Sequence, residues 1–470
     1  MSHIPSVEAV SDPSPAVSGG AFGRKGIGWA VFEWSRNPYY NVVVMAVFAP
    51  YFATHVVNNG AMGQTLVGLT ITIAGIIMAF VAPILGAITD KGGRKKPFIL
   101  IAILVLVVCG LCLGTVTPGL SAAVPVGMFL MIIGYCAYTV LELLHNAMLP
   151  GAGAPKSLPM ISGLGLSLGN AAGVTMLALI VLATQAELFG LSGPDIARLS
   201  APAVALWISL FIGLFFWLMP DVYRPGATWR GALEDSLAPA NRIDPVSWII
   251  GKFRHHPNIM RYLAGRMIYA DGVAALLTLG SVYVAGHLGW SGEQTALLGI
   301  VSFIFAVPGG FFGGFLDRTF GPKRALMIEL SAIIGLAILQ LSITQDAILF
   351  GLIPAQHEVW PGGMFPHLSD LAYVALIIPA SLFMVACISS SRYMLVHIAP
   401  PDKVGEFFGF YAMAGSVTVW IGPGLVALVT WLSNDQRIGF ASVLALLIAG
   451  LLVISTVHAD KTPEHLKSGD

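Results

Sequence analysis

Twelve long, mostly apolar stretches run through this chain, and they constrain its fold more than any other feature. A helix that crosses the hydrocarbon core of a bilayer needs ~20 apolar residues. Inside lipid, stretches of this length must satisfy their backbone hydrogen bonds internally, which favours helices. The predicted spans are 29–57, 64–89, 97–117, 122–149, 159–184, 201–219, 258–286, 293–316, 324–344, 370–398, 403–432 and 438–458. We therefore predict an all-α membrane protein with twelve transmembrane helices.

The composition supports a membrane location. Only 10% of the 470 residues are charged and 56% are hydrophobic, whereas soluble domains carry about 25% charged residues. We therefore expect the apolar outer surface of the protein to contact the lipid bilayer. The net charge of zero gives no indication of a nucleic-acid partner. The four cysteines lie inside apolar runs, with Cys109 and Cys112 spaced as CxxC in mid-span. We interpret them as packing residues and predict no metal and no cofactor.

Charge placement divides the chain into two halves. The longest internal hydrophilic stretch, 221–257, is predicted to be a cytoplasmic linker between an N-terminal six-helix bundle (28–220) and a C-terminal one (258–458). Residues 1–27 are Pro/Ser-rich without a signal sequence, and with 459–470 they are predicted to be cytoplasmic tails. All but four of the 24 Lys and Arg fall on one side of the predicted membrane. The positive-inside rule then places both termini in the cytoplasm, and the short loops favour a plasma (inner) membrane.

A charged loop occurs twice, at matching positions of the two halves. GAITDKGGRKKPF (86–98) separates spans two and three, and GGFLDRTFGPKRAL (313–326) separates spans eight and nine. In each copy a Gly stands four residues before an Asp, and basic residues follow. The candidate gating residues are Gly86, Asp90, Gly93, Arg94, Lys95, Gly313, Asp317 and Arg318. Such an internal repeat is typical of transporters built from two related halves.

The pattern GxxxDKxGRKK resembles the loop motif of the major facilitator superfamily, and the resemblance covers residues 28–458. It implies two pseudo-symmetric six-helix bundles, a central cavity and alternating access. Four blocks, 28–53, 145–173, 267–291 and 389–423, also resemble the vacuole-effluxer family of amino-acid exporters and bacterial permeases. Where that family usually has DWANS, this chain has EWSRN, with Glu33, Ser35 and Arg36.

The superfamily resemblance implies a role for the charged loops. Asp90 is expected to face the start of span eleven, near Asp402 and Lys403, with Arg94 and Lys95 binding across the bundle interface. The pair Asp317 and Arg318 is expected to do the same against the start of span five. These contacts form only when the cytoplasmic side is closed, so they would act as a gate. The simpler alternative is that the basic loop only fixes the topology.

Charged residues inside the spans of the first half are the first candidate site. A charge at mid-bilayer costs about 2.5–3.5 kcal/mol on insertion scales. The candidates on spans one and four are Glu33, Arg36, Asn37, Asn41, Glu142, His145 and Asn146. Each set shares one helix face by its spacing. Glu33 and Arg36 either bind substrate or form an ion pair within the helix. Glu142 is favoured as the proton-coupling group, because a low-dielectric cavity favours a protonated carboxyl, and His145 is a weaker candidate.

The second half contributes three charged residues on spans seven and ten, namely Arg266, Asp271 and Arg392. Asp271 is a candidate for substrate binding or coupling. Arg392 either binds a substrate carboxylate in a bidentate manner or pairs with an acid of span eleven such as Glu406. Arg266 pairs with Asp271 in one alternative, although five-residue spacing puts them on partly different faces. The resemblance implies that spans one, four, seven and ten line the cavity.

These features predict a secondary active transporter and no enzyme, because no Walker loop, nucleophile elbow or HExxH motif is present. A site with charges of both signs suits a small-molecule zwitterion such as an amino acid, coupled to a proton or Na⁺ gradient. The alternatives are a sugar–cation symporter, a drug/proton antiporter, or a receptor or assembly factor on the same scaffold. We expect a monomer.

Overall fold

The computed structural model describes residues 23–92, 94–154, 157–221, 255–400, 407, 411 and 418–459. The helices of the first half are α1 (Arg24–Pro38), α2 (Phe48–Tyr51), α3 (Gly60–Gly92), α4 (Lys96–Leu113), α5 (Ala123–Asn146), α6 (Leu158–Gln185) and α7 (Gly193–Leu218). Those of the second half are α10 (Pro257–His287), α11 (Gly292–Phe320), α12 (Pro322–Leu341), α13 (Leu368–Ile398), α15 (Ile421–Ser433), α16 (Gln436–Ala441) and α17 (Val443–Ser455).

Among the described residues, ten helices are long and apolar enough to cross a membrane. The predicted spans two to ten each correspond to one of them, and the twelfth predicted span corresponds to α16 and α17. Span eleven is represented by the shorter apolar helix α15, since most of 403–417 lies outside the described residues. The order of these apolar helices therefore agrees with the prediction for spans two to twelve.

The first predicted span is interrupted in a way that the sequence analysis did not foresee. After Pro38 the chain forms a π-helical segment, η1 (Tyr39–Ala46), and after α2 with its Pro50 it forms a second, η2 (Phe52–Val56). Proline has no N–H to donate and its ring clashes with the carbonyl of the preceding turn, so the regular hydrogen-bond ladder cannot continue. Wider π turns are a common way of accommodating such a break, often near functional sites.

Short elements complete the chain. They are the 3₁₀ turns η3 (Leu149–Gly151) and η5 (Leu188–Gly190) and the antiparallel hairpin of β1 (Ala347–Ile348) and β2 (Ile353–Pro354). Several helices begin with a proline in their first turn, where the missing N–H is not needed. Helix α11 begins with a capping box, in which Ser291 and Gln294 satisfy each other's backbone N–H groups.

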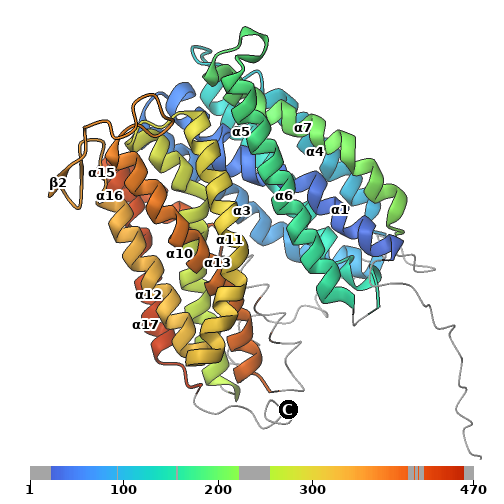
Figure 1. Cartoon of the computed structure of the whole chain (residues 1–470). Coiled ribbons are helices and arrows are strands. Elements are labelled where there is room, and N and C mark those ends of the chain that lie inside the picture. Colours follow the sequence, from blue (N-terminus) through green and yellow to red (C-terminus); the bar gives the residue numbers. More distant parts are fainter. Residues whose placement is uncertain are drawn as a thin grey trace, which may run out of the picture.

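The helices form two groups that follow the two halves of the sequence (Figure 1). In the first group α1 packs on α6 and α7, and α5 packs on α3 and α4. In the second, α13 packs on α11 and α12, and α10 packs on α17. Contacts between the groups are made mainly by α3 with α15 and by α6 with α11. The chain is therefore built as two helical bundles joined along two helix pairs.

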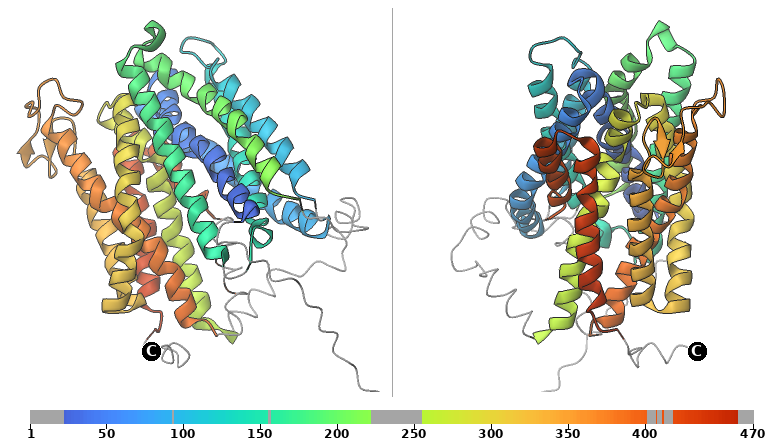
Figure 2. Two further views of the ribbon diagram at one scale, coloured as in Figure 1. Left: turned by 45° about the vertical axis from the view of Figure 1, so that its right-hand side comes forward. Right: turned by 90° about the vertical axis from the view of Figure 1, so that its left-hand side faces the viewer.

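The two bundles meet near one end of the molecule and diverge toward the other (Figure 2). We call the diverging end the basic end; α1 and α10 begin there, and α3 and α17 end there. At the opposite end Gln64 Nε2 donates to Thr430 Oγ1 at 2.8 Å and to the Gln436 carbonyl at 3.0 Å. A Cβ at Gly68 would lie 3.0 Å from the Ala427 Cβ, so the helices approach closely there. The described contacts thus join the bundles at the end away from the basic loops.

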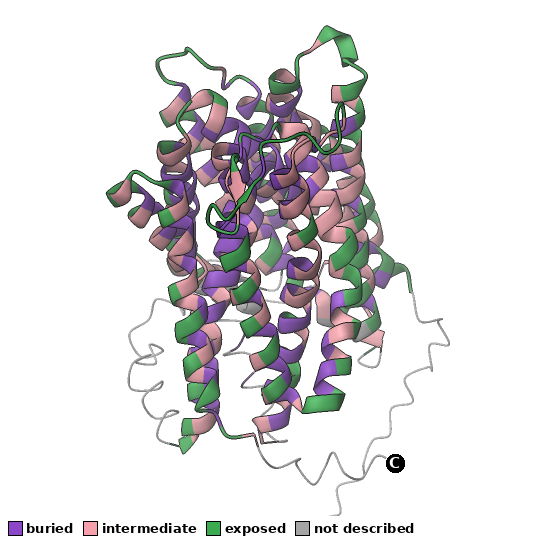
Figure 3. Ribbon diagram, turned by 60° about the vertical axis from the view of Figure 1, so that its left-hand side comes forward, coloured by how far each residue is buried: buried purple, intermediate pink, exposed green. Residues whose placement is uncertain are grey.

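Many exposed residues lie along the outer helices (Figure 3), and large apolar side chains are prominent among them. Leu210 and Trp217 on α7 and Phe311 on α11 are among the exposed large side chains. A soluble monomer rarely exposes such an extended apolar surface. This exposed apolar surface agrees with a bundle whose outer surface contacts lipid.

Candidate functional site

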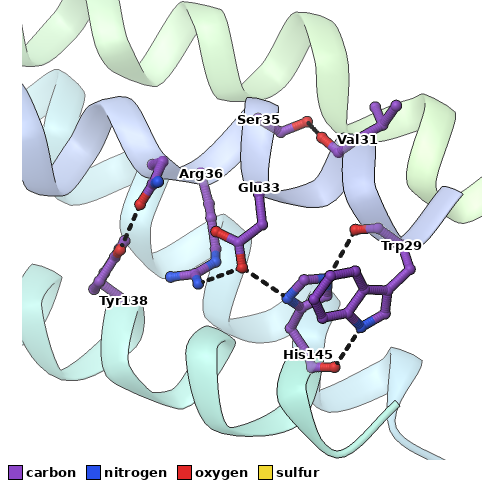
Figure 4. Close-up of polar contacts among 8 residues, drawn as sticks. Trp29, Val31, Glu33, Ser35, Arg36, Tyr138 and His145 are labelled. Atoms are coloured by element: carbon purple, nitrogen blue, oxygen red, sulfur yellow. Dashed lines mark hydrogen bonds and ion pairs between the residues drawn. The ribbon is translucent and has the colours of Figure 1, made fainter. Parts of the chain in front are cut away.

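The centre of the candidate site is Glu33, on the third turn of α1. Its Oε1 lies 2.7 Å from Arg36 Nη2 and 3.1 Å from His145 Nδ1, which comes from the end of α5 (Figure 4). Glu33 is 8% exposed, Arg36 4% and His145 0%. Three of the predicted candidates from two helices are thus brought together. Because charges in so buried a place need partners, the three side chains stabilise one another.

The His145 ring is held from several directions. Its Nε2 lies 2.8 Å from the Trp29 carbonyl oxygen, and the Trp29 indole nitrogen donates to the His145 carbonyl at 2.9 Å. The imidazole stacks on the Trp29 ring at 4.1 Å and on the Phe32 ring at 4.4 Å between centroids. These contacts fix the ring plane, with Nε2 on the Trp29 carbonyl and Nδ1 near Glu33 but without an aligned hydrogen bond among the described residues.

Arg36 is only partly satisfied. Its guanidinium carbon lies 4.9 Å from the centre of the Tyr138 ring, a favourable cation–π arrangement. Nη2 binds Glu33, but the buried Nε and Nη1 have no hydrogen-bond partner among the residues described. Buried donors without acceptors cost about 1–3 kcal/mol each. The cluster therefore has spare capacity for an anionic or carbonyl group.

Glu142 and Asn146 lie at the solvent side of this cluster. Both are exposed on the last two turns of α5, although Glu142 interacts electrostatically with both Arg36 and Glu33. An acid that is accessible and close to a buried cation is suited to meet a positively charged group from solution. The cluster as a whole thus has a buried cation on one side and an accessible anion on the other.

Asn37 and Asn41 extend the site toward the opposite end. Asn37 Oδ1 accepts a hydrogen bond from the Tyr138 hydroxyl at 3.0 Å. Asn41 is buried, and its Nδ2 has no hydrogen-bond partner among the described residues. Both asparagines pack on α6, where a Cβ at Gly169 or Gly173 would overlap their amide groups. Glycine at these positions allows the close approach of α6 and α1.

The candidates of the second half are farther apart from one another. Asp271 is buried and accepts a hydrogen bond from Thr418 Oγ1 at 3.1 Å. Arg266 Nη1 donates to the Tyr411 carbonyl at 2.9 Å, and its guanidinium carbon lies 3.4 Å from the centre of that ring. Within the described chain no ion pair joins Arg266 to Asp271. The two residues are therefore engaged by different partners.

A group of hydroxyls surrounds Ser391 of α13. Its side chain contacts the hydroxyls of Tyr262, Tyr269 and Tyr411. The next residue, Arg392, is exposed. Its alternative partner from the sequence analysis, Glu406, lies outside the described residues. Arg266, through Tyr411, adjoins this hydroxyl group, which therefore consists of neutral hydroxyls beside one cation.

The charged loops are described only in part. Gly86 and Asp90 belong to α3, but their side chains, together with Gly93, Asp402 and Lys403, lie outside the description. Arg94 is exposed and Lys95 is buried. The backbone N–H groups of Lys95 and Lys96 donate to the two carboxylate oxygens of Asp221 at 3.0 and 3.2 Å. This acid caps the start of α4, where unpaired N–H groups carry partial positive charge.

In the second loop, Gly313 packs directly on the Ala386 backbone of α13. Asp317 is buried at the end of α11 and Arg318 is exposed. Asp317 interacts with Ser390 and with Glu329 of α12. Glu329 is fully buried, and its Oε1 accepts a hydrogen bond from Ser390 Oγ at 2.8 Å. The described neighbours of Asp317 thus belong to its own bundle.

Sequence reasoning missed several residues of these clusters, among them Tyr138, Tyr262, Tyr411 and Glu329. Tyr138 had a signal, because Tyr138, Glu142 and His145 are spaced by four and three residues and so share one face of α5. Glu329 had one too, as the only acid in an otherwise apolar predicted span. Nothing in the local sequence marks Tyr262 as a partner of Ser391, since they lie on different helices.

Comparison with known proteins decides the family. The model of a family described as "Vacuole effluxer Atg22 like" matches residues 63–466. The chain belongs to this family. An "Uncharacterized MFS-type transporter YxiO" of Bacillus subtilis (strain 168) is 22% identical over 448 residues, which cover 93% of this chain and 95% of that protein. "Autophagy-related protein 22-1" of Aspergillus niger is 22% identical over 323 residues, covering 64% of this chain. The match spans 47% of that fungal protein.

Solved transporter structures share the fold of this family member. The nucleoside transporter NupG has a TM-score of 0.61 at 13% identity, covering 92% of this chain and 98% of that one. The xylose transporter XylE from E. coli, in an inward open conformation, has a TM-score of 0.60 at 14% identity, covering 95% and 99%. The chain thus has the twelve-helix major facilitator fold and is a multi-pass membrane transporter rather than an enzyme, as the sequence predicted.

Proposed function

We propose that this chain is a proton-coupled secondary transporter of amino acids or similar zwitterions, working by alternating access. The observation that carries the proposal is the pairing of a partly unsatisfied buried Arg36 with an accessible Glu142. A zwitterion presents a carboxylate to the first and an ammonium group to the second. The description of the family as vacuole effluxers supports transport of a small solute.

Arg36 would bind the carboxylate through Nε and Nη1. Guanidinium and carboxylate can form two parallel hydrogen bonds, which is stronger and more directional than a contact with Lys. Both nitrogens are covered in this conformation. Substrate binding therefore requires the Arg36 and Tyr138 side chains to rearrange, and the recovered hydrogen bonds would favour that change.

The membrane orientation follows from the same proposal. We place the basic end in the cytoplasm of a plasma (inner) membrane, because Lys and Arg concentrate there. The bundles diverge at this end and are joined by Gln64 and Thr430 at the other. The described conformation would then be open to the cytoplasm. Asp90, Arg94, Lys95, Asp317 and Arg318 would meet new partners when this side closes.

Asp271, Arg266 and Arg392 are proposed as the contribution of the second bundle. Asp271 is buried beside α15, the shorter helix that also contacts α3 of the other bundle. A substrate that contacts both bundles biases their relative position, which is the requirement for alternating access. We propose that a monomer is sufficient, since both bundles are present in one chain.

The direct test is uptake of labelled amino acids by proteoliposomes, with and without an imposed pH gradient. We expect uptake driven by the gradient. Arg36→Lys keeps the charge but loses the second hydrogen bond, and about 1.4 kcal/mol lost corresponds to ~10-fold weaker binding. Glu142→Gln should lower uptake as well.

Glu358→Gln, on an exposed loop at the opposite end, is the matched control and should transport normally. Folded protein that takes up none of the amino acids would refute the proposed substrate class. Uptake that ignores the pH gradient would refute proton coupling alone, and repeating the experiment with a Na⁺ gradient would then identify the other candidate ion.

A further inference from the structure

The hydrogen positions on His145 can be derived from its neighbours. Nε2 lies 2.8 Å from the Trp29 carbonyl oxygen, which can only accept a hydrogen bond. Nε2 must therefore carry a hydrogen. A ring turned by 180° would instead place ring carbons against the Trp29 oxygen and the Glu33 carboxylate. A carbon at 2.8 Å from an oxygen is closer than van der Waals contact allows. The rotated ring is therefore excluded, and the described ring orientation is retained.

The other ring nitrogen faces a second acceptor. Nδ1 lies 3.1 Å from Glu33 Oε1, an ion-pair distance, but it has no aligned hydrogen-bond partner among the described residues. If the imidazole carried only the Nε2 hydrogen, two lone pairs would face each other across this distance in a buried place. A proton on Nδ1 or on the Glu33 carboxyl would replace this repulsion by an attraction and give the buried Nδ1 a partner.

Arg36 indicates which of the two atoms holds it. Its Nη2 donates at 2.7 Å to the same Oε1. A carboxylate oxygen accepts two donors readily, whereas a protonated oxygen would have to direct its own hydrogen at Nδ1 while accepting from Arg36. The arrangement is thus best described as Arg36⁺, Glu33⁻ and His145⁺, with one oxygen between two cations.

The charges that face the pair agree with this arrangement. On α1 they are Glu33 and Arg36, and on α5 Glu142, which interacts with both. Helix α7 offers Phe215, whose ring lies 6.4 Å from the imidazole, and Lys96 of α4 lies 5.9 Å from that phenyl ring. Helix α6 approaches Glu33 through Gly165. With Glu142 ionised, the four charges of α1 and α5 sum to zero only when His145 is protonated.

We propose that the Glu33–His145 pair is the site that carries the coupling proton, an assignment that rests on the proposed function of proton-coupled transport. The pair links α1 to α5. When the proton leaves, Nδ1 and Oε1 repel each other and the link between the two helices is lost. Glu33 then pairs with Arg36 alone. When a substrate carboxylate draws Arg36 away, Glu33 holds the proton on His145 more firmly. Substrate and proton are thereby coupled through one carboxylate oxygen.

The accessible Glu142 gives the proton a route. Glu33 and His145 have little exposure, with side-chain values of 11% and 0%. Glu142 is exposed and near both Glu33 and Arg36. Glu142 would then relay protons between solution and the pair, whereas the sequence analysis favoured it as the coupling site itself.

The first test needs no substrate. Full-length protein labelled with nitrogen-15 histidine, in lipid nanodiscs at about pH 6, should show His145 with both ring nitrogens protonated. The signal is assigned by its absence in His145→Gln. A carboxylic acid infrared band that disappears in Glu33→Gln, with a neutral His145, would also place the proton in the pair. A neutral ring with bare Nδ1 and no such band would overturn the proposal.

Glu33→Gln gives an independent check on the same spectrum. The glutamine amide can donate to Nδ1 without an extra proton, so His145 should become neutral with its hydrogen on Nε2. An imidazolium that persists in Glu33→Gln would show that Glu33 does not hold the proton and would overturn the pairing.

The second test measures coupling in proteoliposomes. In His145→Gln the ratio of uptake with a pH gradient to uptake without one should fall to about one, whereas His458→Gln, on an exposed histidine, should keep the normal ratio. A normal ratio in His145→Gln would overturn the proposal. If the unsubstituted protein transports no amino acid, the proposed function fails, but the spectroscopic test of the proton site still stands.

Discussion

Trp29 and His145 are hydrogen-bonded to each other twice, each through its side chain to the other's backbone carbonyl. The two bonds measure 2.9 and 2.8 Å and join the first turns of α1 to the last turn of α5. Because both side chains also stack on each other, neither helix can slide without breaking all of these contacts. The reciprocal pair therefore fixes the position of α1 along α5, and with it the position of Glu33 relative to the imidazole.

The first prediction concerns the indole nitrogen. Trp29→Phe keeps an aromatic ring against His145 but removes the donor to its buried carbonyl. The carbonyl keeps the backbone N–H of Met148 at 3.0 Å, so the variant loses one hydrogen bond, worth about 0.5–1.5 kcal/mol. We expect a lower midpoint of thermal unfolding in detergent. Trp431→Phe, at a residue 62% exposed on α15, should unfold like the unsubstituted protein. Equal midpoints for the two variants would argue against a structural role for the reciprocal pair.

The second prediction concerns the close approach of α6 to α1. A Cβ at Gly173 would overlap the Asn41 amide, whereas a Cβ at Gly163 on the same helix would meet no atom within 4 Å. Gly173→Ala should destabilise the protein by about 1–3 kcal/mol through overpacking. Gly163→Ala should be neutral or slightly stabilising, because alanine favours helix. Thermal unfolding of both variants decides the matter, and a reversed order would contradict the packing argument.

The positions of the helices were predictable from the sequence for a simple reason. The bilayer fixes both the length and the apolar character of a span, so the stretch 64–89 corresponds to α3 (Gly60–Gly92). The break of the first span was not predicted, although Pro38 and Pro50 were visible. A hydropathy pattern does not register that proline lacks a backbone N–H. Whether a proline bends a helix or produces a π turn depends on the tertiary packing around it.

The candidate site was predictable in part. Helical spacing placed Glu33 beside Arg36, and a bond of 2.7 Å joins them. That His145 would face Glu33 depends on how α5 is rotated against α1, and spacing within one helix contains no such information. The backbone acceptor of His145, the Trp29 carbonyl, belongs to every residue type and leaves no trace in the sequence at all.

The third prediction concerns Glu329, which is fully buried between α12 and α13. Its Oε1 accepts from Ser390 Oγ at 2.8 Å, and its Oε2 has no hydrogen-bond partner among the residues described. Ser390→Ala should lower stability by about 1–3 kcal/mol, because the buried carboxyl loses its donor. Ser209→Ala, whose hydroxyl binds only its own helix, is the control.

A double variant separates the hydrogen bond from packing. Glu329→Leu combined with Ser390→Ala removes both partners of this hydrogen bond, and replacing both is often close to neutral. The contact between Ser390 and Asp317 is lost in both variants, so it does not affect their comparison. We expect the double variant to unfold at a higher temperature than Ser390→Ala alone. If it is less stable than either single variant, the two residues contribute through shape rather than through their hydrogen bond.

The fourth prediction concerns the contact that joins the bundles at the end opposite the basic loops. Gln64 Nε2 donates two hydrogen bonds to the second bundle, and Gln64 Oε1 accepts a third from Gln436 Nε2 at 3.4 Å. Each is worth about 0.5–1.5 kcal/mol, and 1.4 kcal/mol changes a two-state ratio ~10-fold. Gln64→Ala should therefore favour the conformation that is closed at the basic end. The matched control is Met62→Ala, two residues away and 43% exposed.

Spin labels report this equilibrium directly. Labels at Phe80 of α3 and Phe311 of α11, both exposed and on different bundles, measure the separation at the basic half of the molecule. In Gln64→Ala the shorter distances between the labels should gain population relative to the unsubstituted protein and to Met62→Ala. An unchanged distribution would mean that other contacts, such as Gly68 against Ala427, determine the equilibrium. The two bundles are joined at one end and diverge toward the basic end. If the protein moves by alternating access, weaker contacts at the joined end must therefore be accompanied by a smaller separation of the bundles at the basic end.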